Sequence, residues 1–386
     1  MRLPLSLVAL FFCVSCSSQK GPPAHNAFDP FIYQVDTSGL LSGAAFALDA
    51  GKDLVAAERD PMAISPEIRR YIDQLPGQAS PEEKWSLLVQ QFRDGLFEVE
   101  FDTFATLPVA ETFLRRKGNC LSVTMLLAAM AREIGVKASF NQVEVPPKQI
   151  REREVAVNFR HINLLVELPE GRQVIDFGVV DFDIAFASAT VPDRVALSQY
   201  YNNNAVADLV SGEWARAFLR LRKAVELAPG NSDFWVNLGV LYERVGEYDL
   251  ATDAFIQALQ LNRLNLVAAR NLERVANDAG HGGLIGGLVT SVERLRNDDP
   301  GLVYFEARDA YEEGKYAEAK RLLKRVVNKA ADDHRLHFLM GITSYRLQDF
   351  GESTRHLREA FALVRDRQIK KGYRRQLFEL KQSANL

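Results

Sequence analysis

The sequence lacks several features that mark particular classes of protein. It has no excess of basic residues, because 47 lysines and arginines face 50 aspartates and glutamates, and this argues against a nucleic-acid-binding protein. Four of its six histidines, His281, His334, His337 and His356, have no cysteine or carboxylate companions at a metal-ligand spacing. We therefore expect no nucleic-acid partner, no metal and no other cofactor.

The chain begins with an apolar run, residues 3–14, that is too short to span a bilayer by itself. This run follows the single charge of Arg2 and precedes a small residue and Cys16, an order that predicts a signal peptide. The ending CVSCSS, residues 13–18, resembles a bacterial lipoprotein signal. The resemblance implies that Cys16 is lipidated and that Ser17 directs the protein to the outer membrane, facing the periplasm. A cleaved secretory peptide and an uncleaved anchor are the alternatives.

Cysteine is scarce, with three in 386 residues. Cys13 would leave with the signal peptide and Cys16 would carry lipid, so only Cys120 would remain. A single thiol in a compartment where thiols are normally oxidised in pairs is either buried or used.

Cys120 lies at the predicted start of a central helix. Gly118 and Asn119 interrupt the preceding structure, Asn119 is a favourable N-cap, and Gly135 ends a helix that reaches about Ile134. The helix is apolar nearly all round, which predicts burial on every side. Its first N–H groups and its dipole would stabilise a thiolate and could donate to an oxyanion. Alternatively, Cys120 is an inert packing residue, as most lone cysteines are.

Short elements surround this helix. The pattern predicts amphipathic helices at 66–74 and 81–93, a strand or loop at 97–104, a helix at 106–116, a strand at 137–145 and a solvated loop at 146–155. Two further strands, 161–168 and 173–179, flank a Pro-Glu-Gly-Arg turn and form a hairpin.

The hairpin brings two polar residues to one face. If its turn centres on Glu170 and Gly171, residues whose numbers sum to 341 lie opposite each other, so His161 and Asp176 share a face. This register sets Asp176 opposite Leu165, four residues from His161, so direct contact requires a bulge, strong coiling or a different turn. Taken singly, His161 is typical of a core histidine and Asp176 of a turn residue or a buried, hydrogen-bonded acid.

Together these residues resemble the transglutaminase-like superfamily of cysteine enzymes. The resemblance covers residues 82–185 and rests on Lys-Gly-Asn-Cys opening a long apolar helix, with His161 opening one strand and Asp176 in the next. It implies an α+β papain/transglutaminase-like fold in which Cys120 is the nucleophile, His161 the base and Asp176 the orienting acid. The chain lacks the tryptophan that often follows the histidine and an assignable side-chain oxyanion donor, which leaves the Cys120 N–H for that role.

A repeat of 34 residues takes over after about residue 193. The unit that starts at Ser232 resembles the tetratricopeptide consensus, with Trp235, Gly239, Tyr242 and Ala251 among the matching positions. The same phase recurs at residues 198, 300 and 334, with a degenerate unit at 266–299. We therefore expect an all-α solenoid of about five helix pairs.

Such a solenoid would present a groove to a peptide or protein. Asn204, Asn237 and Arg270, on first helices, are candidate binding residues.

The chain has 386 residues, of which 47% are hydrophobic, and this is enough for two or three globular units. We divide it into a signal peptide (1–15), a tether (16–29), a transglutaminase-like domain (30–193), repeats (198–367) and a C-terminal capping helix (368–386).

The sequence leaves two functions of different classes. In one, an envelope lipoprotein uses Cys120, His161 and Asp176 to hydrolyse or transfer an acyl group on a peptide or protein that the repeats recruit. In the other, the lipoprotein is a non-catalytic scaffold whose repeats bind other proteins. The lone thiol and the complete triad favour the enzyme.

Overall fold

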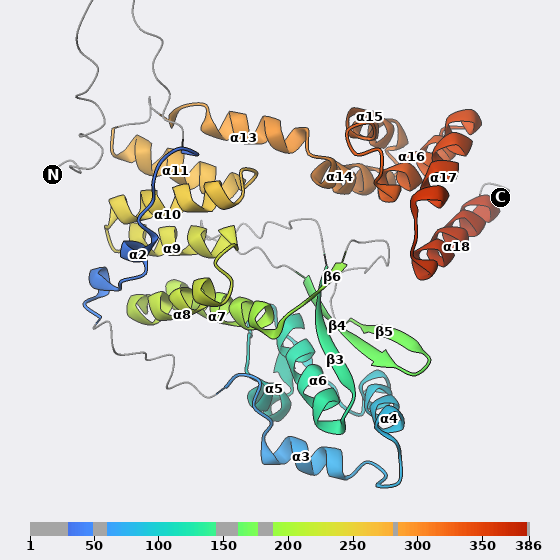
Figure 1. Ribbon diagram of the computed structural model, residues 1–386, viewed down its shortest axis with the longest axis horizontal. Helices are drawn as coiled ribbons and strands as arrows, with labels where there is room; N and C mark the ends of the chain where they lie inside the picture. Colours follow the sequence, from blue (N-terminus) through green and yellow to red (C-terminus); the bar gives the residue numbers. More distant parts are fainter. Residues whose placement is uncertain (1–29, 49–59, 144–160, 177–187, 281–284, 384–386) are drawn as a thin grey trace, which may run out of the picture. The chain divides into compact units, whose positions relative to one another are not determined.

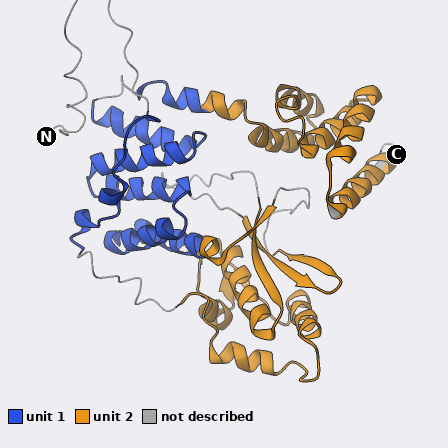
Figure 2. Cartoon of the chain, viewed as in Figure 1, with its two compact units in different colours: residues 1–58, 150–157, 197–292 blue, residues 59–149, 158–196, 293–386 orange. Residues whose placement is uncertain are grey.

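The structure is a computed structural model that describes residues 30–48, 60–143, 161–176, 188–280 and 285–383. The predicted signal peptide, tether, lipidated Cys16, loop 146–155 and His281 lie outside these residues. Figure 2 shows two compact units, one with residues 1–58, 150–157 and 197–292 and the other with residues 59–149, 158–196 and 293–386. Within the described ranges, no helix combines the length and the apolar character that crossing a membrane requires.

The helices that precede Cys120 within the second unit start at local sequence signals. They are α3 (Pro66–Asp73), α4 (Pro81–Arg93) and α5 (Val109–Arg115). Ser65 and Ser80 cap α3 and α4, each followed by proline at the first helical position, where no N–H is needed. The helix predicted from residue 106 begins only at Val109, because Pro108 is extended at the N-cap.

The central helix α6 (Cys120–Ile134) has the predicted bounds. The Asn119 side chain accepts a hydrogen bond from the Ser122 N–H, and Gly135 ends the helix in the left-handed conformation, at φ 97°. Eleven consecutive residues from Leu121 to Ala131 are buried. In Figure 1 α6 lies against strands β3 and β4, and it also contacts α3, α4 and α5, which explains why it is apolar on all sides.

A four-stranded antiparallel sheet follows α6. Its strands are β3 (Lys137–Val143), β4 (His161–Leu168), β5 (Gly171–Ile175) and β6 (Ser188–Val191), in the order β5-β4-β3-β6. β4 has the predicted bounds. The sequence patterns did not indicate β6, and the predicted residues 177–179 of the second hairpin strand lie outside the described chain. A separate parallel pair joins β1 (Glu100–Phe101) to β2 (Lys117–Gly118).

The predicted hairpin register is wrong by two residues. Leu168 pairs with Gly171 and Leu164 with Ile175, so opposite residues sum to 339 and the turn centres on Pro169 and Glu170. A shift of two keeps every side chain on its predicted face. It also carries Asp176 toward the level of Asn163, two residues from His161 instead of four. The different turn therefore removes the obstacle to contact between His161 and Asp176.

Paired helices form the rest of the chain. They are α7 (Asp193–Ser211), α8 (Trp214–Leu227), α9 (Ser232–Arg244), α10 (Tyr248–Leu261), α11 (Leu266–Asp278), α13 (Leu288–Asn297), α14 (Pro300–Glu312), α15 (Tyr316–Val326), α16 (His334–Arg346), α17 (Phe350–Leu363) and α18 (Arg367–Ser383). Helices α9, α11, α14 and α16 start at the positions that the 34-residue period predicts. A Cβ on Gly239 would lie 2.5 Å from the Phe255 ring, so glycine lets α9 and α10 approach closely.

Residues 30–48 pack against the repeats of the first unit, whereas we predicted that they begin the transglutaminase-like domain. The main-chain carbonyl of Leu40 accepts a hydrogen bond from the Tyr242 hydroxyl, and the Gln260 side chain donates to the carbonyls of Pro30 and Tyr33 at 2.9 and 2.6 Å. The short helix α2 (Thr37–Leu40) lies against α10, and the 3₁₀ turn η1 (Ala44–Phe46) lies against α8. These contacts join segments about 200 residues apart, which local sequence patterns do not reveal.

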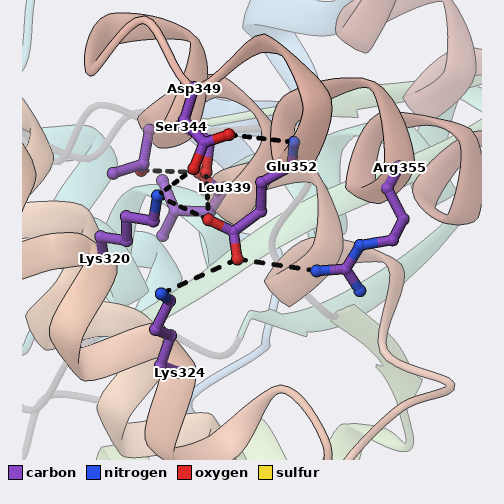
Figure 3. A network of polar contacts seen from close by, with 8 residues as sticks. Lys320, Lys324, Leu339, Ser344, Asp349, Glu352 and Arg355 are labelled. Atoms are coloured by element: carbon purple, nitrogen blue, oxygen red, sulfur yellow. Dashed lines mark hydrogen bonds and ion pairs between the residues drawn. The ribbon is translucent and has the colours of Figure 1, made fainter.

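Ion pairs tie α15 to α17 in the second unit. The Lys320 ammonium lies 2.8 Å from Asp349 and 2.5 Å from Glu352, and Lys324 and Arg355 also approach the Glu352 carboxylate. Figure 3 shows these side chains converging on Glu352. Lys320 and Glu352 are each less than a fifth exposed, so this network is less screened by water than an ordinary surface pair.

Candidate active site

The start of α6 is held by the segment that precedes α5. Gly118 accepts a hydrogen bond from the Asp102 N–H, and the Asn119 N–H donates to the Ala105 carbonyl at 2.9 Å. The Asn119 side chain donates to the Thr106 hydroxyl at 2.6 Å while its oxygen caps Ser122. These buried bonds fix the backbone around Cys120 and leave its thiol half-buried.

His161 is placed beside this helix start by strand β4. It is the first residue of the strand and is 5% exposed. One residue further along, the carbonyl of Ile162 accepts a hydrogen bond from the Thr124 hydroxyl, in the first turns of α6, at 3.3 Å. The strand and the helix are therefore joined next to the residues of interest.

The structure brings all three predicted site residues together. The Nε2 atom of His161 lies 2.6 Å from Oδ2 of Asp176, which directly follows β5. The side chain of Cys120 also acts on the pKa of His161, so the thiol lies near the imidazole. Thiol, imidazole and carboxylate thus stand in the order that a nucleophile, its base and an orienting acid require.

The electrostatics of the site favour a charged imidazole. Burial alone would lower the pKa of His161, but the hydrogen bonds and negative charges of Asp176 and Cys120 outweigh it and raise this pKa to about 9. A histidine in this environment retains a proton taken from the thiol. The arrangement can therefore support proton transfer from the thiol to the imidazole and nucleophilic attack on a carbonyl carbon.

Two buried asparagines of the site were not predicted from the sequence. The Asn163 amide donates to Oδ2 of Asp176 at 3.2 Å, and the Asn141 amide donates to the Asn163 oxygen at 2.9 Å. Asn163 lies two residues from His161, on the same face of β4. Polar residues at that spacing in an otherwise apolar strand are the signal that could have identified Asn163.

The candidate binding residues of the repeats have different environments. Asn237 is fully buried and donates to the Asn202 side chain at 2.8 Å, which joins α9 to α7. Asn204 is half-buried and donates to the Tyr200 carbonyl one turn earlier, whereas Arg270 is exposed. Of the three, Arg270 is the most exposed.

Metal binding has no obvious location in the described chain. Its histidines, cysteine and carboxylates form no group of three or more that could hold a metal ion. His334 instead contacts the Tyr373 hydroxyl through Nδ1 at 2.8 Å, and His337 contacts His356 through their Nδ1 atoms at 2.9 Å.

Comparison with known proteins bears on the repeats. The family model described as "Tetratricopeptide repeat" matches residues 221–253, within α8 to α10, and no curated protein matches the chain. Together with the helix pairs at 34-residue spacing, this match identifies tetratricopeptide repeats in the C-terminal half. Such repeats mediate contacts with peptides and proteins.

Several solved structures resemble part of the chain. YrrB, described as a tetratricopeptide-repeat protein with an unusual peptide-binding site, is 20% identical, with 45% of this chain and 89% of YrrB covered and a TM-score of 0.24. Pseudomonas aeruginosa PilF is 16% identical, covering 50% and 90%, with a TM-score of 0.26. MamA from Desulfovibrio magneticus RS-1 is 16% identical, covering 45% and 96%, with a TM-score of 0.25.

Proposed function

We propose that Cys120, His161 and Asp176 form a transglutaminase-like cysteine site that hydrolyses or transfers acyl groups. The observation that supports the proposal most directly is the position of His161, which lies 2.6 Å from Asp176 and near the Cys120 thiol. A histidine that served packing alone would need neither an acid nor a thiol as its partner. The helix start beside Cys120 adds N–H donors and a positive dipole.

The reaction follows from these positions. His161 takes the thiol proton, and Sγ of Cys120 attacks the carbonyl carbon of an amide or ester. The N–H of Cys120 donates to the oxyanion that forms. When the tetrahedral intermediate collapses, the imidazolium gives its proton to the departing amine or alcohol, and a thioester remains on Cys120. Water then regenerates the thiol and releases an acid, or an amine does so and receives the acyl group.

The repeats would bring the substrate to this reaction. Tetratricopeptide repeats mediate protein interactions, so the substrate proposed here is a peptide or a protein with an accessible amide or ester. We also propose that lipidation of Cys16 holds the chain in the bacterial envelope, at the outer membrane and facing the periplasm. A Cys16→Ser variant would then lose incorporation of labelled fatty acid and would move from the membrane fraction to the soluble fraction.

Labelling with a thiol-directed electrophilic probe tests the enzyme proposal. We expect Cys120 in the full chain to react faster than free cysteine under the same conditions. His161→Ala should remove that advantage and Cys120→Ala should remove the label. A Cys120 that reacts no faster than free cysteine, with or without His161, would contradict the proposal.

A non-catalytic scaffold is the second candidate, and the family match within the repeats favours it. In that case, capture of partner proteins by the repeats would be the whole function. Cys120→Ala and His161→Ala would leave the captured proteins and the cellular phenotype unchanged, whereas Arg270→Glu, on an exposed first-helix position, would reduce capture.

A further inference from the structure

A line of buried amides runs from the centre of the sheet to the proposed active site. Asn141 of β3 and Asn163 of β4 pair directly across the two strands, and they are 4% and 0% exposed. The line continues from Asn163 to Asp176 and then to His161, all through side-chain hydrogen bonds of 3.2 Å or less. The neighbours of both asparagines along their strands include the buried core residues Phe140, Ile162 and Leu164.

Burial makes these amides costly unless each is hydrogen-bonded. A buried amide without a partner destabilises a protein, because it has lost its hydrogen bonds to water without replacing them. Apolar residues of similar size could fill both positions without that risk. The two asparagines are thus better explained by what they hold in place than by packing.

The hydrogen bonds determine which way the Asn163 amide points. Its oxygen accepts from the Asn141 amide, so its NH₂ group must face Asp176. A flipped Asn163 would set its oxygen against the carboxylate and its NH₂ against the NH₂ of Asn141, two repulsive contacts. The Asp176 carboxylate only accepts, so it requires the Asn163 NH₂ group to face it, and Asn141 holds that orientation by donating to the Asn163 oxygen.

We propose that Asn163, oriented by Asn141, is a positioning residue that holds the Asp176 carboxylate against His161. This inference rests on the proposed cysteine chemistry and adds the residues that align it. Oδ2 of Asp176 receives both Asn163 and His161, so the amide fixes the oxygen that orients the imidazole. It also stabilises the ionised carboxylate, because a donated hydrogen bond favours the charged form.

The test compares three full-length leucine variants and adds Asn163→Ser as a partial rescue. Asn163→Leu removes the donor, Asn141→Leu removes only the group that orients it, and Asn202→Leu removes a similarly buried amide of the repeats. The readout is the pKa of His161, followed by NMR of ring-labelled histidine and assigned with His161→Ala. Unfolding by denaturant is measured in parallel, because all three substitutions should lower stability.

We expect Asn163→Leu to lower the pKa of His161 by about one unit, and Asn141→Leu to lower it by less. Asn202→Leu should leave it unchanged, and Asn163→Ser, which retains a donor, should recover part of the shift. An unchanged His161 titration in Asn163→Leu, despite a loss of stability like that of Asn202→Leu, would overturn the inference. Failure of Cys120 to react in the wild-type chain would instead contradict the proposed function, and the two results are measured independently.

Discussion

His161 and His356 are both buried, yet their pKa values move in opposite directions. They are 5% and 3% exposed, and burial alone would lower the pKa of each. At His161, hydrogen bonds and charges from Asp176 and Cys120 raise the pKa to about 9. At His356, burial together with the charges of Arg355, His337 and Lys320 lowers it to about 4, against a smaller opposing effect of Glu352. Burial is the largest cause of the lowered pKa at His356, whereas the neighbours of His161 outweigh burial and reverse the sign.

The opposite pKa shifts indicate two kinds of environment for a buried imidazole. Nε2–H of His337 donates to the Ala331 carbonyl at 3.0 Å, so its Nδ1 must accept from Nδ1–H of His356 when both rings are neutral. This pair in the repeats is satisfied without charge. His161 faces an acid and a thiol, an environment that favours its charged form. The first arrangement suits a packed helix interface and the second suits proton transfer.

Removing the Asp176 carboxylate should abolish the difference in pKa between His161 and His356, and it has the largest expected effect. Asp176→Asn keeps the shape of the side chain but removes its charge, so the pKa of His161 should fall by roughly two units or more. Acylation of Cys120 should slow by about 10²- to 10⁴-fold. NMR titration and stopped-flow acylation measure the two effects. Glu352→Gln is the matched control near His356 and should leave both His161 quantities unchanged.

The two histidines should also make stability depend on pH in opposite ways. The folded pKa of His356 is depressed, so its contribution is present above about pH 6.5 and is lost as the pH falls through about 4. A shift from 6.5 to about 4 corresponds to roughly 3 kcal/mol. The folded pKa of His161 is raised, so its contribution is present below about pH 6.5 and is lost as the pH rises through about 9.

Urea unfolding measured across this pH range gives both the loss of stability at acid pH and the loss at alkaline pH. His356→Asn should reduce the loss of stability at acid pH and keep the loss at alkaline pH, whereas His161→Asn should do the reverse. Identical pH profiles for the two variants would mean that the environments do not differ as described.

A smaller effect is expected from a substitution at Gly118, where the backbone next to Cys120 is closely packed. A Cβ on Gly118 would lie 2.7 Å from Cβ of Ser122, and neither atom can move without shifting the helix start. Gly118→Ala should therefore cost about 1–3 kcal/mol in unfolding free energy. It should also slow Cys120 acylation and leave the pKa of His356 unchanged. Gly230→Ala, where nothing lies within 4 Å of the added carbon, is the control and should change stability by less than about 1 kcal/mol.

The smallest expected effect is a change in the pKa of His356 after a substitution at Lys320, in the repeats. Lys320 lowers the pKa of His356 through its charge and also neutralises Glu352. Lys320→Met should therefore raise the pKa of His356 by about half a unit, as measured by NMR. A fall would show that the ion pairs of Figure 3 do not act on this histidine.

Local signals accounted for much of the fold. Asn119 and Gly135 delimit α6 because caps act on their own helix, and the 34-residue period placed the starts of α9, α11, α14 and α16. The hairpin register was wrong by two residues because Pro169 and Glu170 form the turn, a choice that depends on turn geometry. Strand alternation survived that error, so the shared face of His161 and Asp176 was predicted.

Long-range packing was not predictable in the same way. The contact of residues 30–48 with α8 and α10 depends on groups such as Tyr242 and Gln260, about 200 residues away. The role of Asn141 likewise appears only when β3 and β4 are aligned. Asn163 could have been singled out by its spacing from His161, but its partner could not.

The central claim is that His161 activates Cys120 for acyl transfer. The most direct measurement is to mix the full chain with an activated ester such as p-nitrophenyl acetate and to locate the acyl group by mass spectrometry of peptides. The account predicts a thioester on Cys120 that water or an added amine discharges, with its formation strongly slowed in His161→Ala. Equal acylation of Cys120 in the wild type and in His161→Ala, or no thioester in either, would contradict it.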